Sequence, residues 1–388
     1  MKRLLYIAFH DTSNQLFGVQ NKILSQCRAF EEYGYQVDLI ERQGPDTVLI
    51  SDKQTTPKIV KSHRTITGNK NLRSVLDKQN QVRDIKAFIR GKSYDACYIR
   101  YDFSDPGFIS LLKTIRTSCP KVALELPTYP YEDENRTRAL SRIKLAVDMH
   151  FRKQLHHYVD FIVTFYSGYA TLFNIPVLVV PNGFDFSTMS MITASLSNDA
   201  IHIIAVSSMR EWHGYERFIE GMHTYYQSNT SNRRNIVLHL VGNGREYNKY
   251  KELTEKYELT DHVIMEGSMH GEALDALYEQ CALGIDSLAR HRSGISILSS
   301  LKSREYGAKG IPMINSCPID VIEDDFPYLL QVSADEAPVD MDTIIKFHDR
   351  CFSDKNSRVA VAQMIRTYME ERSGMKGTLA QVVASFDA

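Results

Sequence analysis

Small and hydroxyl-bearing residues immediately before a predicted helix could bind phosphate. Ser293-Gly294-Ile295-Ser296 is followed by Ser299 and Ser300, and a helical pattern begins by Lys302. The first N–H groups of a helix have no partner within the helix and lie at the positive end of its dipole. A helix start of this composition is therefore a candidate phosphate site.

Two further segments carry groups suited to an anionic ligand. Arg210 and His213 follow a predicted strand and could donate to phosphate oxygens, His213 either when protonated or as a neutral hydrogen-bond donor. Gly242 and Gly244 form a G-x-G at the end of the next strand, where a missing side chain would let a ligand approach the backbone. A solvated arginine and a simple turn are the structural alternatives.

Residues 302–312 have the local pattern of a helix, a glycine cap and a strand. From that pattern alone, Glu305 could be an ordinary polar residue on an exposed helix face. The segment also resembles the K-x-x-E-Y-x-A-x-G-x-P signature of family 4 retaining glycosyltransferases, which have the GT-B fold. In that family the glutamate accepts hydrogen bonds from the ribose hydroxyls of a nucleotide-sugar donor. The resemblance implies this role for Glu305, with Lys302 in the same donor site.

The resemblance continues along most of the chain, with three departures. Residues 207–214 correspond to the family's G-R-L-x-x-x-K-G loop, but Ser208 replaces the arginine and His213 the lysine that neutralise the donor diphosphate. Ile297 stands where the family often has a second glutamate. The resemblance therefore makes Arg210 and His213 the candidates to stabilise the diphosphate, with Glu305 as the third active-site residue.

The first half of the chain supplies the expected acceptor site. Gly18 precedes the first predicted helix, as does the family's glycine-containing loop beside the donor phosphate. Glu125 lies near the end of a predicted strand and Tyr129 and Tyr131 follow it, and the three could hydrogen-bond to and stack on a sugar acceptor. The tyrosines could equally belong to the core.

Strand-like runs alternate with helical patterns in both halves of the chain, which predicts two α/β domains with parallel sheets. We expect an acceptor-binding domain over residues 1–184, a linker over 185–200, a nucleotide-sugar domain over 201–370 and a C-terminal helix over 371–388 that could return to the first domain. Two such Rossmann-like units predict a central ligand cleft, as the GT-B fold implies. The expected strands are 3–9, 36–41, 96–99, 122–126, 161–165, 177–180, 201–206, 236–241, 263–266, 283–285 and 312–315.

Composition excludes several other functions. The formal net charge of −1 over 388 residues gives no global electrostatic case for nucleic acid. The six cysteines are scattered without a CxxC pair, so neither a zinc site nor a disulfide framework is indicated. No run approaches the roughly 18 apolar residues that a transmembrane helix needs. We therefore expect a cytoplasmic protein, and the absence of an Asp-x-Asp pair at a strand end predicts catalysis without a metal ion.

Residues 135–157 predict a basic amphipathic helix, in which apolar residues recur at spacings of three and four among six cations. Such a helix can lie on an anionic membrane surface, which would make the protein peripheral on the inner face of the membrane. A solvated cationic face over a buried apolar stripe is the alternative. The apolar residues are Leu140, Ile143, Val147 and Phe151, and the cations are Arg136, Arg138, Arg142, Lys144, Arg152 and Lys153.

The resemblance implies a hexosyltransferase-like enzyme that transfers a sugar, with retention, from a nucleotide-diphosphate donor to a glycan or lipid-linked glycan acceptor in surface polysaccharide biosynthesis. UDP is the first choice of nucleotide, and no cofactor is expected because the nucleotide sugar is a substrate. A nucleotide-sugar epimerase or hydrolase on the same fold is one alternative. A non-catalytic GT-B-like partner subunit is another, favoured by the departures at Ser208, His213 and Ile297.

Overall fold

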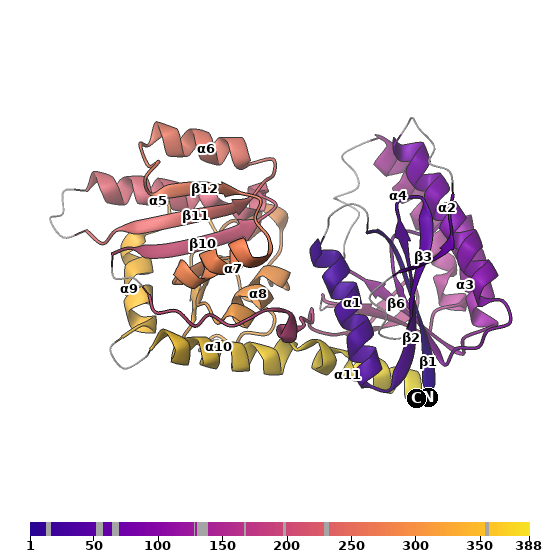
Figure 1. Ribbon diagram of the computed structural model, residues 1–388. Helices are drawn as coiled ribbons and strands as arrows, with labels where there is room; N and C mark the ends of the chain where they lie inside the picture. The colour runs from indigo at the N-terminus through magenta and orange to yellow at the C-terminus, as the bar shows by residue number, and fades with distance from the viewer. Residues whose placement is uncertain are drawn as a thin grey trace. The chain divides into compact units, whose positions relative to one another are not determined.

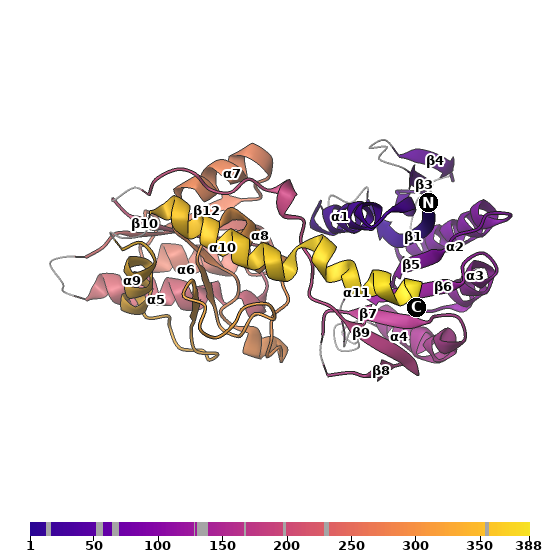
Figure 2. The same ribbon diagram turned by 90° about the horizontal axis from the view of Figure 1, so that it is seen from below.

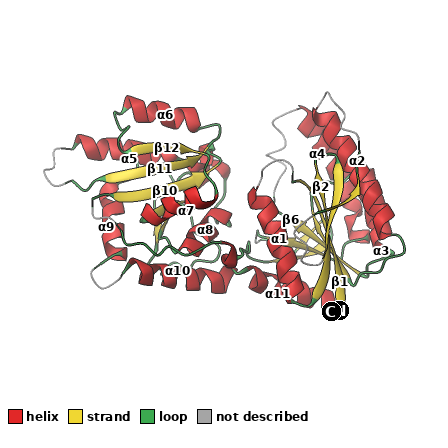
Figure 3. Cartoon of the chain, in the orientation of Figure 1, coloured by secondary structure: helices red, strands yellow, loops and turns green. Residues whose placement is uncertain are grey.

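A computed structural model describes residues 1–12, 17–51, 57–63, 70–127, 129, 139–166, 168–196, 199–228, 233–353 and 357–388. The chain forms two compact units (Figure 1). Unit 1 comprises Met1–Gly183 and Met375–Ala388, and unit 2 comprises Phe184–Gly374. Each unit has helices packed around one main sheet (Figure 3). The prediction of two α/β domains with parallel sheets is confirmed.

Unit 1 contains a nine-stranded sheet in the order β4-β3-β2-β1-β5-β6-β7-β9-β8. Its central strands, from β2 to β9 in that order, are parallel, and antiparallel strands lie at both edges. The strands are β1 (Lys2–Asp11), β2 (Tyr35–Gln43), β3 (Asp46–Ser51), β4 (Lys58–Lys61), β5 (Ala96–Arg100), β6 (Lys121–Leu126), β7 (Phe161–Thr164), β8 (Thr171–Leu172) and β9 (Ile175–Val179).

Helices cover both faces of this sheet, which explains why its central strands are almost continuously apolar. Side chains of α1 and α11 form one core with one face of the sheet, and side chains of α2 and α3 form a second core with the other (Figures 1 and 2). The helices are α1 (Phe17–Glu32), α2 (Lys70–Ile89), α3 (Pro106–Arg116), α4 (Ala139–Phe151), the 3-10 helix η1 (Arg152–His157) and α11 (Met375–Asp387). The C-terminal helix therefore belongs to unit 1, in which both chain termini lie (Figure 1).

Unit 2 contains a six-stranded parallel sheet in the order β12-β11-β10-β13-β14-β15. Right-handed crossovers place α5 and α6 on one face and α7 and α8 on the other, where α10 packs against α8 (Figure 2). The strands are β10 (Ile201–Ser207), β11 (Ile236–Gly242), β12 (Val263–Gly267), β13 (Leu283–Ile285), β14 (Met313–Asn315) and β15 (Leu329–Gln331). The helices are η2 (Phe186–Thr188), η3 (Glu211–His213), α5 (Tyr215–Gln227), α6 (Tyr247–Lys256), α7 (Gly271–Gln280), η4 (Arg290–Ser293), α8 (Leu301–Lys309), α9 (Met341–Cys351) and α10 (Arg358–Ser373).

The expected amphipathic helix over 135–157 needs correction. The α-helix ends at Phe151 and continues as the 3-10 helix η1, while residues 135–138 lie outside the described residues. The predicted apolar stripe is not the buried face, because Ile143 is 63% exposed whereas Leu145 and Asp148 are buried. The Asp148 carboxylate can be buried because it accepts hydrogen bonds from the Tyr101 hydroxyl and from the backbone N–H of Ser104, just before α3.

Candidate functional site

The strand order of unit 2 reverses between β10 and β13, so the loops that leave these two strands diverge. Ligands of open α/β sheets bind in the crevice that forms at such a point, outside the carboxyl ends of the strands. The loop after β10 carries Arg210 and His213, and the loop after β13 carries Asp286 and Arg290. Helix α8, which follows the second loop, adds Lys302 and Glu305.

A buried ion pair joins α8 to the end of β13. The Lys302 ammonium lies 2.9 Å from Asp286 Oδ1 and donates to the Asp286 carbonyl at 2.6 Å and to Ser287 Oγ at 3.2 Å. Burial alone would raise the pKa of Asp286, but Lys302, Arg290 and the Ser300 hydroxyl outweigh burial and lower this pKa to about 2. Asp286 is therefore a permanent anion, and its charge is already matched by Lys302.

Glu305 lies one helical turn after Lys302 and has no hydrogen bond or ion pair with any residue that the structure describes. Burial raises the pKa of its carboxyl to about 7, with Asp286 adding to the effect and Lys302 opposing it. A carboxylate in such a position is a strong acceptor without a donor. The Glu305 carboxylate is therefore suited to accept hydrogen bonds from hydroxyl groups of a ligand.

His213 is buried at the end of η3, and its Nδ1 accepts a hydrogen bond from the Arg210 backbone N–H at 2.9 Å. Burial, reinforced by the charges of Lys302 and Arg290, lowers the pKa of His213 to about 2. The imidazole is therefore neutral, and the proton that Nδ1 lacks is on Nε2. Of the two predicted roles, the structure supports the neutral donor. The partly buried guanidinium of Arg210 makes no ion pair within the described chain.

The two glycines of the G-x-G turn have a structural explanation. A Cβ at Gly242 would lie 1.9 Å from the Ser207 carbonyl oxygen, and a Cβ at Gly244 would lie 2.1 Å from that of Ser208. Both glycines are needed because the end of β11 packs directly against the loop after β10. Their predicted contact with a nucleotide stays a prediction.

The hydroxyls predicted to bind the donor are already engaged. Ser300 is the N-cap of α8: its Oγ accepts from the Ser303 N–H at 3.2 Å and donates to Asp286. Ser299 Oγ donates to Asp320 Oδ2 at 2.7 Å. Both hydroxyls thus hold α8 and its neighbours in place, and the predicted contact of this helix start with phosphate stays a prediction.

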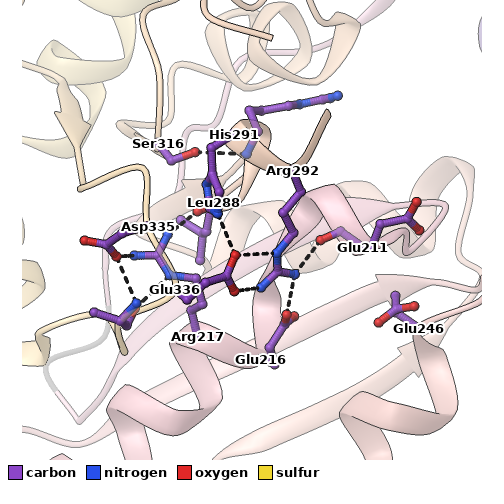
Figure 4. Close-up of polar contacts among 12 residues, drawn as sticks. Glu211, Glu216, Arg217, Glu246, Leu288, His291, Arg292, Ser316, Asp335 and Glu336 are labelled. Atoms are coloured by element: carbon purple, nitrogen blue, oxygen red, sulfur yellow. Dashed lines mark hydrogen bonds and ion pairs between the residues drawn. The ribbon is translucent and has the colours of Figure 1, made fainter. Parts of the chain in front are cut away.

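A network of charges anchors the loop after β13 (Figure 4). Arg292 binds both carboxylate oxygens of Glu336, approaches Glu216 Oε1 at 2.5 Å and donates to the Glu211 carbonyl at 2.7 Å. His291 Nε2 lies 2.6 Å from Glu336 Oε1. Both side chains thus hold the loop in place. Ile297, at the position where the family often has a second glutamate, is 48% exposed.

The sequence analysis missed Arg290. Its buried Nε has no hydrogen bond within the described residues, and its charge acts on His213, Asp286 and Lys302. The only available signal was its place five residues after β13, at the point where the strand order reverses.

Glu125, predicted to contact the acceptor, is fully buried in unit 1. Its Oε2 accepts from Gln26 at 2.5 Å and from the Tyr98 hydroxyl at 2.6 Å, and Oε1 pairs with Arg100. Burial would raise the pKa of Glu125, but Arg100, Lys22 and these hydrogen bonds lower it. The prediction was wrong because every carboxylate oxygen is engaged; Glu125 instead positions Arg100.

The other residues predicted in the acceptor half have mixed positions. Tyr129 is partly buried and packs edge-on against Tyr169 and Phe173, with ring centroids 5.1 and 6.2 Å apart. Tyr131 lies outside the described residues. Gly18 is exposed in the first turn of α1, and among the described residues outside its own helix turn no atom lies within 4 Å of the place where a Cβ would stand.

Unit 1 contains its own cavity of about 820 Å³, where its strand order reverses between β1 and β5. The cavity combines aromatic, cationic and acidic side chains, and the exposed Val75 and Ile143 add apolar surface. None of its lining residues was predicted to bind the acceptor, although Ile143, Lys144 and Val147 belong to the helix predicted to lie on a membrane surface. Those from the ends of β1 and β5 are Phe9, His10, Asp11, Arg100 and Tyr101, and others include Arg42, Lys78, Phe103, Lys144 and Val147.

Comparisons with known proteins bear on both units. Residues 193–301 match the family described as Glycosyl transferases group 1. Sucrose-phosphate synthase from Thermosynechococcus elongatus has a similar structure, with a TM-score of 0.64 and 15% identity over 100% of this chain and 98% of the other. The catalytic domain of starch synthase IV from Arabidopsis thaliana, bound to ADP and acarbose, matches with a TM-score of 0.62 and 10% identity over 100% of this chain and 99% of the other. Anabaena HepE in complex with UDP matches with a TM-score of 0.59 and 11% identity over 100% of both chains.

The fold is GT-B. The likeness extends over the whole chain, so both units take part in it. The matched family segment of this GT-B chain includes the loops after β10 and β13, and it supports a glycosyltransferase function. No curated protein matches the sequence.

Two searches of the described chain gave negative results. No group of three or more His, Cys, Asp or Glu residues in this part of the GT-B chain could hold a metal ion. No helix there combines the length and apolar character that crossing a bilayer requires.

Proposed function

We propose that the chain is a retaining glycosyltransferase that uses a nucleotide-diphosphate sugar, with UDP as the first choice of nucleotide. The observation that carries the proposal is the Glu305 carboxyl, which is held on α8 without a partner among the described residues, at the position of the ribose-binding glutamate in the family signature. Ribose hydroxyls would donate to this carboxylate. The family match to residues 193–301 supports the same function.

Fixed hydrogen-bond donors would stabilise the diphosphate leaving group without a metal ion. Neutral His213 offers Nε2–H, Arg210 offers a guanidinium, and the first N–H groups of α8 face the same loops. Such donors act most strongly where water is excluded. Unchanged turnover in EDTA is expected, whereas loss of turnover that divalent ions restore would contradict this part of the proposal.

The acceptor is proposed to be a glycan or lipid-linked glycan of a surface polysaccharide pathway, bound in the cavity of unit 1. Its aromatic and cationic lining suits a sugar joined to an anionic group. The exposed Arg142, Ile143, Lys144 and Met149 of α4 support peripheral binding of a cytoplasmic protein to an anionic membrane. If the purified protein does not sediment with anionic vesicles at low salt, the proposed membrane binding is wrong.

Thermal unfolding against a panel of nucleoside diphosphates and nucleotide sugars tests the donor assignment. A ligand present at roughly 100 times its Kd stabilises the folded protein by about 2.7 kcal/mol. We expect one nucleotide and its sugar derivatives to raise the Tm by several degrees, and the matching nucleoside to raise it less. A panel in which no nucleotide raises the Tm would overturn the proposed function.

Affinity for the nucleotide sugar is expected to rise as the pH rises through about 7. The protonated Glu305 carboxyl is a poorer acceptor, so binding below this pH must first remove a proton, at a cost of up to about tenfold in affinity for each pH unit. A nucleotide sugar is the right probe because it has no terminal phosphate that titrates near pH 6. Calorimetric titrations between about pH 5.5 and 8 measure the effect. The Glu305→Gln variant should give a flat profile, and a flat profile in the wild type would contradict the ribose role.

A further inference from the structure

Three consecutive residues in the loop after β13 could carry positive charge, and they have different surroundings. Arg292 and His291 are held by Glu336, and Arg292 also by Glu216 (Figure 4). These contacts fix the loop to α5 and to the chain after β15. These contacts hold the backbone of His291 and Arg292 in place, and so they also position the backbone of the adjacent Arg290. The Arg290 side chain makes no contact with Glu216 or Glu336 in this network.

The charge of Arg290 acts on Asp286, but Arg290 forms no ion pair with any residue that the structure describes. Its backbone N–H donates to Ser316 Oγ at 3.4 Å, and its guanidinium carbon lies 5.9 Å from the centre of the Trp212 ring. The Nε atom is buried without a hydrogen bond, and the guanidinium forms no ion pair with the part of the chain described. A buried donor left without a hydrogen bond destabilises the folded protein, so a group of this kind needs an explanation.

The surroundings of Arg290 carry an excess of positive charge. Three cations, Lys302, Arg290 and Arg210, act together on His213. Asp286 lies among them, but it is paired with Lys302 at 2.9 Å and accepts from Ser300. The charges of Arg290 and Arg210 are therefore left to attract an anion to the loops after β13 and β10.

We propose that Arg290 binds the diphosphate of the donor, in place of the two cations that the family signature has at Ser208 and His213. The neutral His213 can supply a hydrogen bond but no charge, and Arg290 supplies the charge from the neighbouring loop. The planar guanidinium can bind two phosphate oxygens at once, which an ammonium cannot do. This inference rests on the proposed function, because it concerns the same donor.

The test compares Arg290→Gln with wild type, using the nucleoside diphosphate among UDP, ADP and GDP that stabilises the wild type most, and the matching nucleoside. Loss of a charge-assisted contact predicts a loss of roughly 10- to 100-fold in affinity for the diphosphate. Affinity for the nucleoside should change by less than about threefold, since it lacks the group that Arg290 binds. Arg290→Lys keeps the charge without the planar fork and should lose an intermediate amount.

Arg234→Gln is the matched control, because Arg234 lies before β11, at the opposite end of the strands, and pairs with the exposed Asp349 at 3.2 Å. It should bind both ligands as the wild type does. Unchanged diphosphate affinity in Arg290→Gln, or equal losses for diphosphate and nucleoside, would overturn the inference while leaving the proposed function intact. If Arg290→Gln does not fold, diphosphate affinity of Arg290→Lys equal to wild type would overturn it. A wild type that binds none of the three diphosphates would overturn both.

Discussion

Glu305→Gln is expected to weaken nucleoside diphosphate binding by roughly 100-fold, because two charge-assisted hydrogen bonds from ribose would be replaced by weaker ones. The amide has nearly the same shape as the carboxyl, so the fold should be unaffected. Calorimetric titration of the variant and the wild type measures the loss. Binding as tight as wild type would reject the assigned ribose role.

The same substitution is expected to stabilise the free protein at high pH. The pKa of Glu305 is raised from its ordinary value of 4.5 to about 7, so the folded state binds this proton more tightly than the unfolded state. The resulting stability is fully present below about pH 4.5 and is lost as the pH rises through about 7. At pH 8 the ionised carboxyl costs up to about 3 kcal/mol, which glutamine avoids.

Thermal unfolding at about pH 5 and pH 8 measures this difference. A gain on the order of 5 °C is expected at pH 8 and almost none at pH 5. A residue that destabilises the free protein while serving a ligand fits the known conflict between stability and activity. Equal or lower stability of Glu305→Gln at pH 8 would show that Glu305 has an internal partner after all.

Lys302→Met is expected to destabilise unit 2 by about 3–5 kcal/mol, because it removes the cation that is paired with the buried Asp286 carboxylate. Adding Asp286→Asn removes the stranded charge, so the double variant should recover part of the loss. Denaturant unfolding of the wild type, the two single variants and the double variant measures the coupling between the residues.

Lys251→Met is the control for this series, because its pair with Glu255 is exposed on both sides and such pairs contribute at most about 1 kcal/mol. A cost for Lys302→Met as small as that of Lys251→Met would contradict the structural role of the ion pair. Because Lys302 supports the fold, its substitution cannot by itself test donor binding, and Glu305→Gln is the better variant for that purpose.

The sheets could be predicted from the sequence because their central strands are covered on both faces and are therefore continuously apolar. The predicted strand over 283–285 coincides with β13, and that over 201–206 is one residue shorter than β10. Strand β3 (Asp46–Ser51), which pairs antiparallel with β2 and β4, was not predicted although Val48, Leu49 and Ile50 form a short apolar run. Periodicity also failed on α4, where Ile143 continues the apolar spacing but faces outward.

The site was predicted only where a local signature specifies it. Glu305 and Lys302 belong to such a signature and both lie on α8, where Lys302 pairs with Asp286 after β13; their roles in donor binding stay predictions. Glu125 was misassigned because the residues that enclose it, Gln26 and Tyr98, are 99 and 27 positions away.

Adjacent residues can also differ in ways that sequence does not reveal. Arg290 and Arg292 are two positions apart, and the contacts of Arg292 with Glu211, Glu216 and Glu336 distinguish them. The charge state of His213 likewise depends on its burial and on the charges of residues distant in sequence, such as Lys302 of α8. Such features follow from tertiary packing and require the structure.

The most direct test of the central claim is the release of nucleoside diphosphate from the nucleotide sugar selected by thermal unfolding, measured with and without a glycan or lipid-linked acceptor. A glycosyltransferase should release one nucleoside diphosphate for each sugar transferred, and release should depend on the acceptor. Consumption of the donor at the same rate without acceptor would indicate an epimerase or hydrolase, and binding without any turnover under either condition would indicate a non-catalytic subunit. Either result would contradict the proposed transfer reaction.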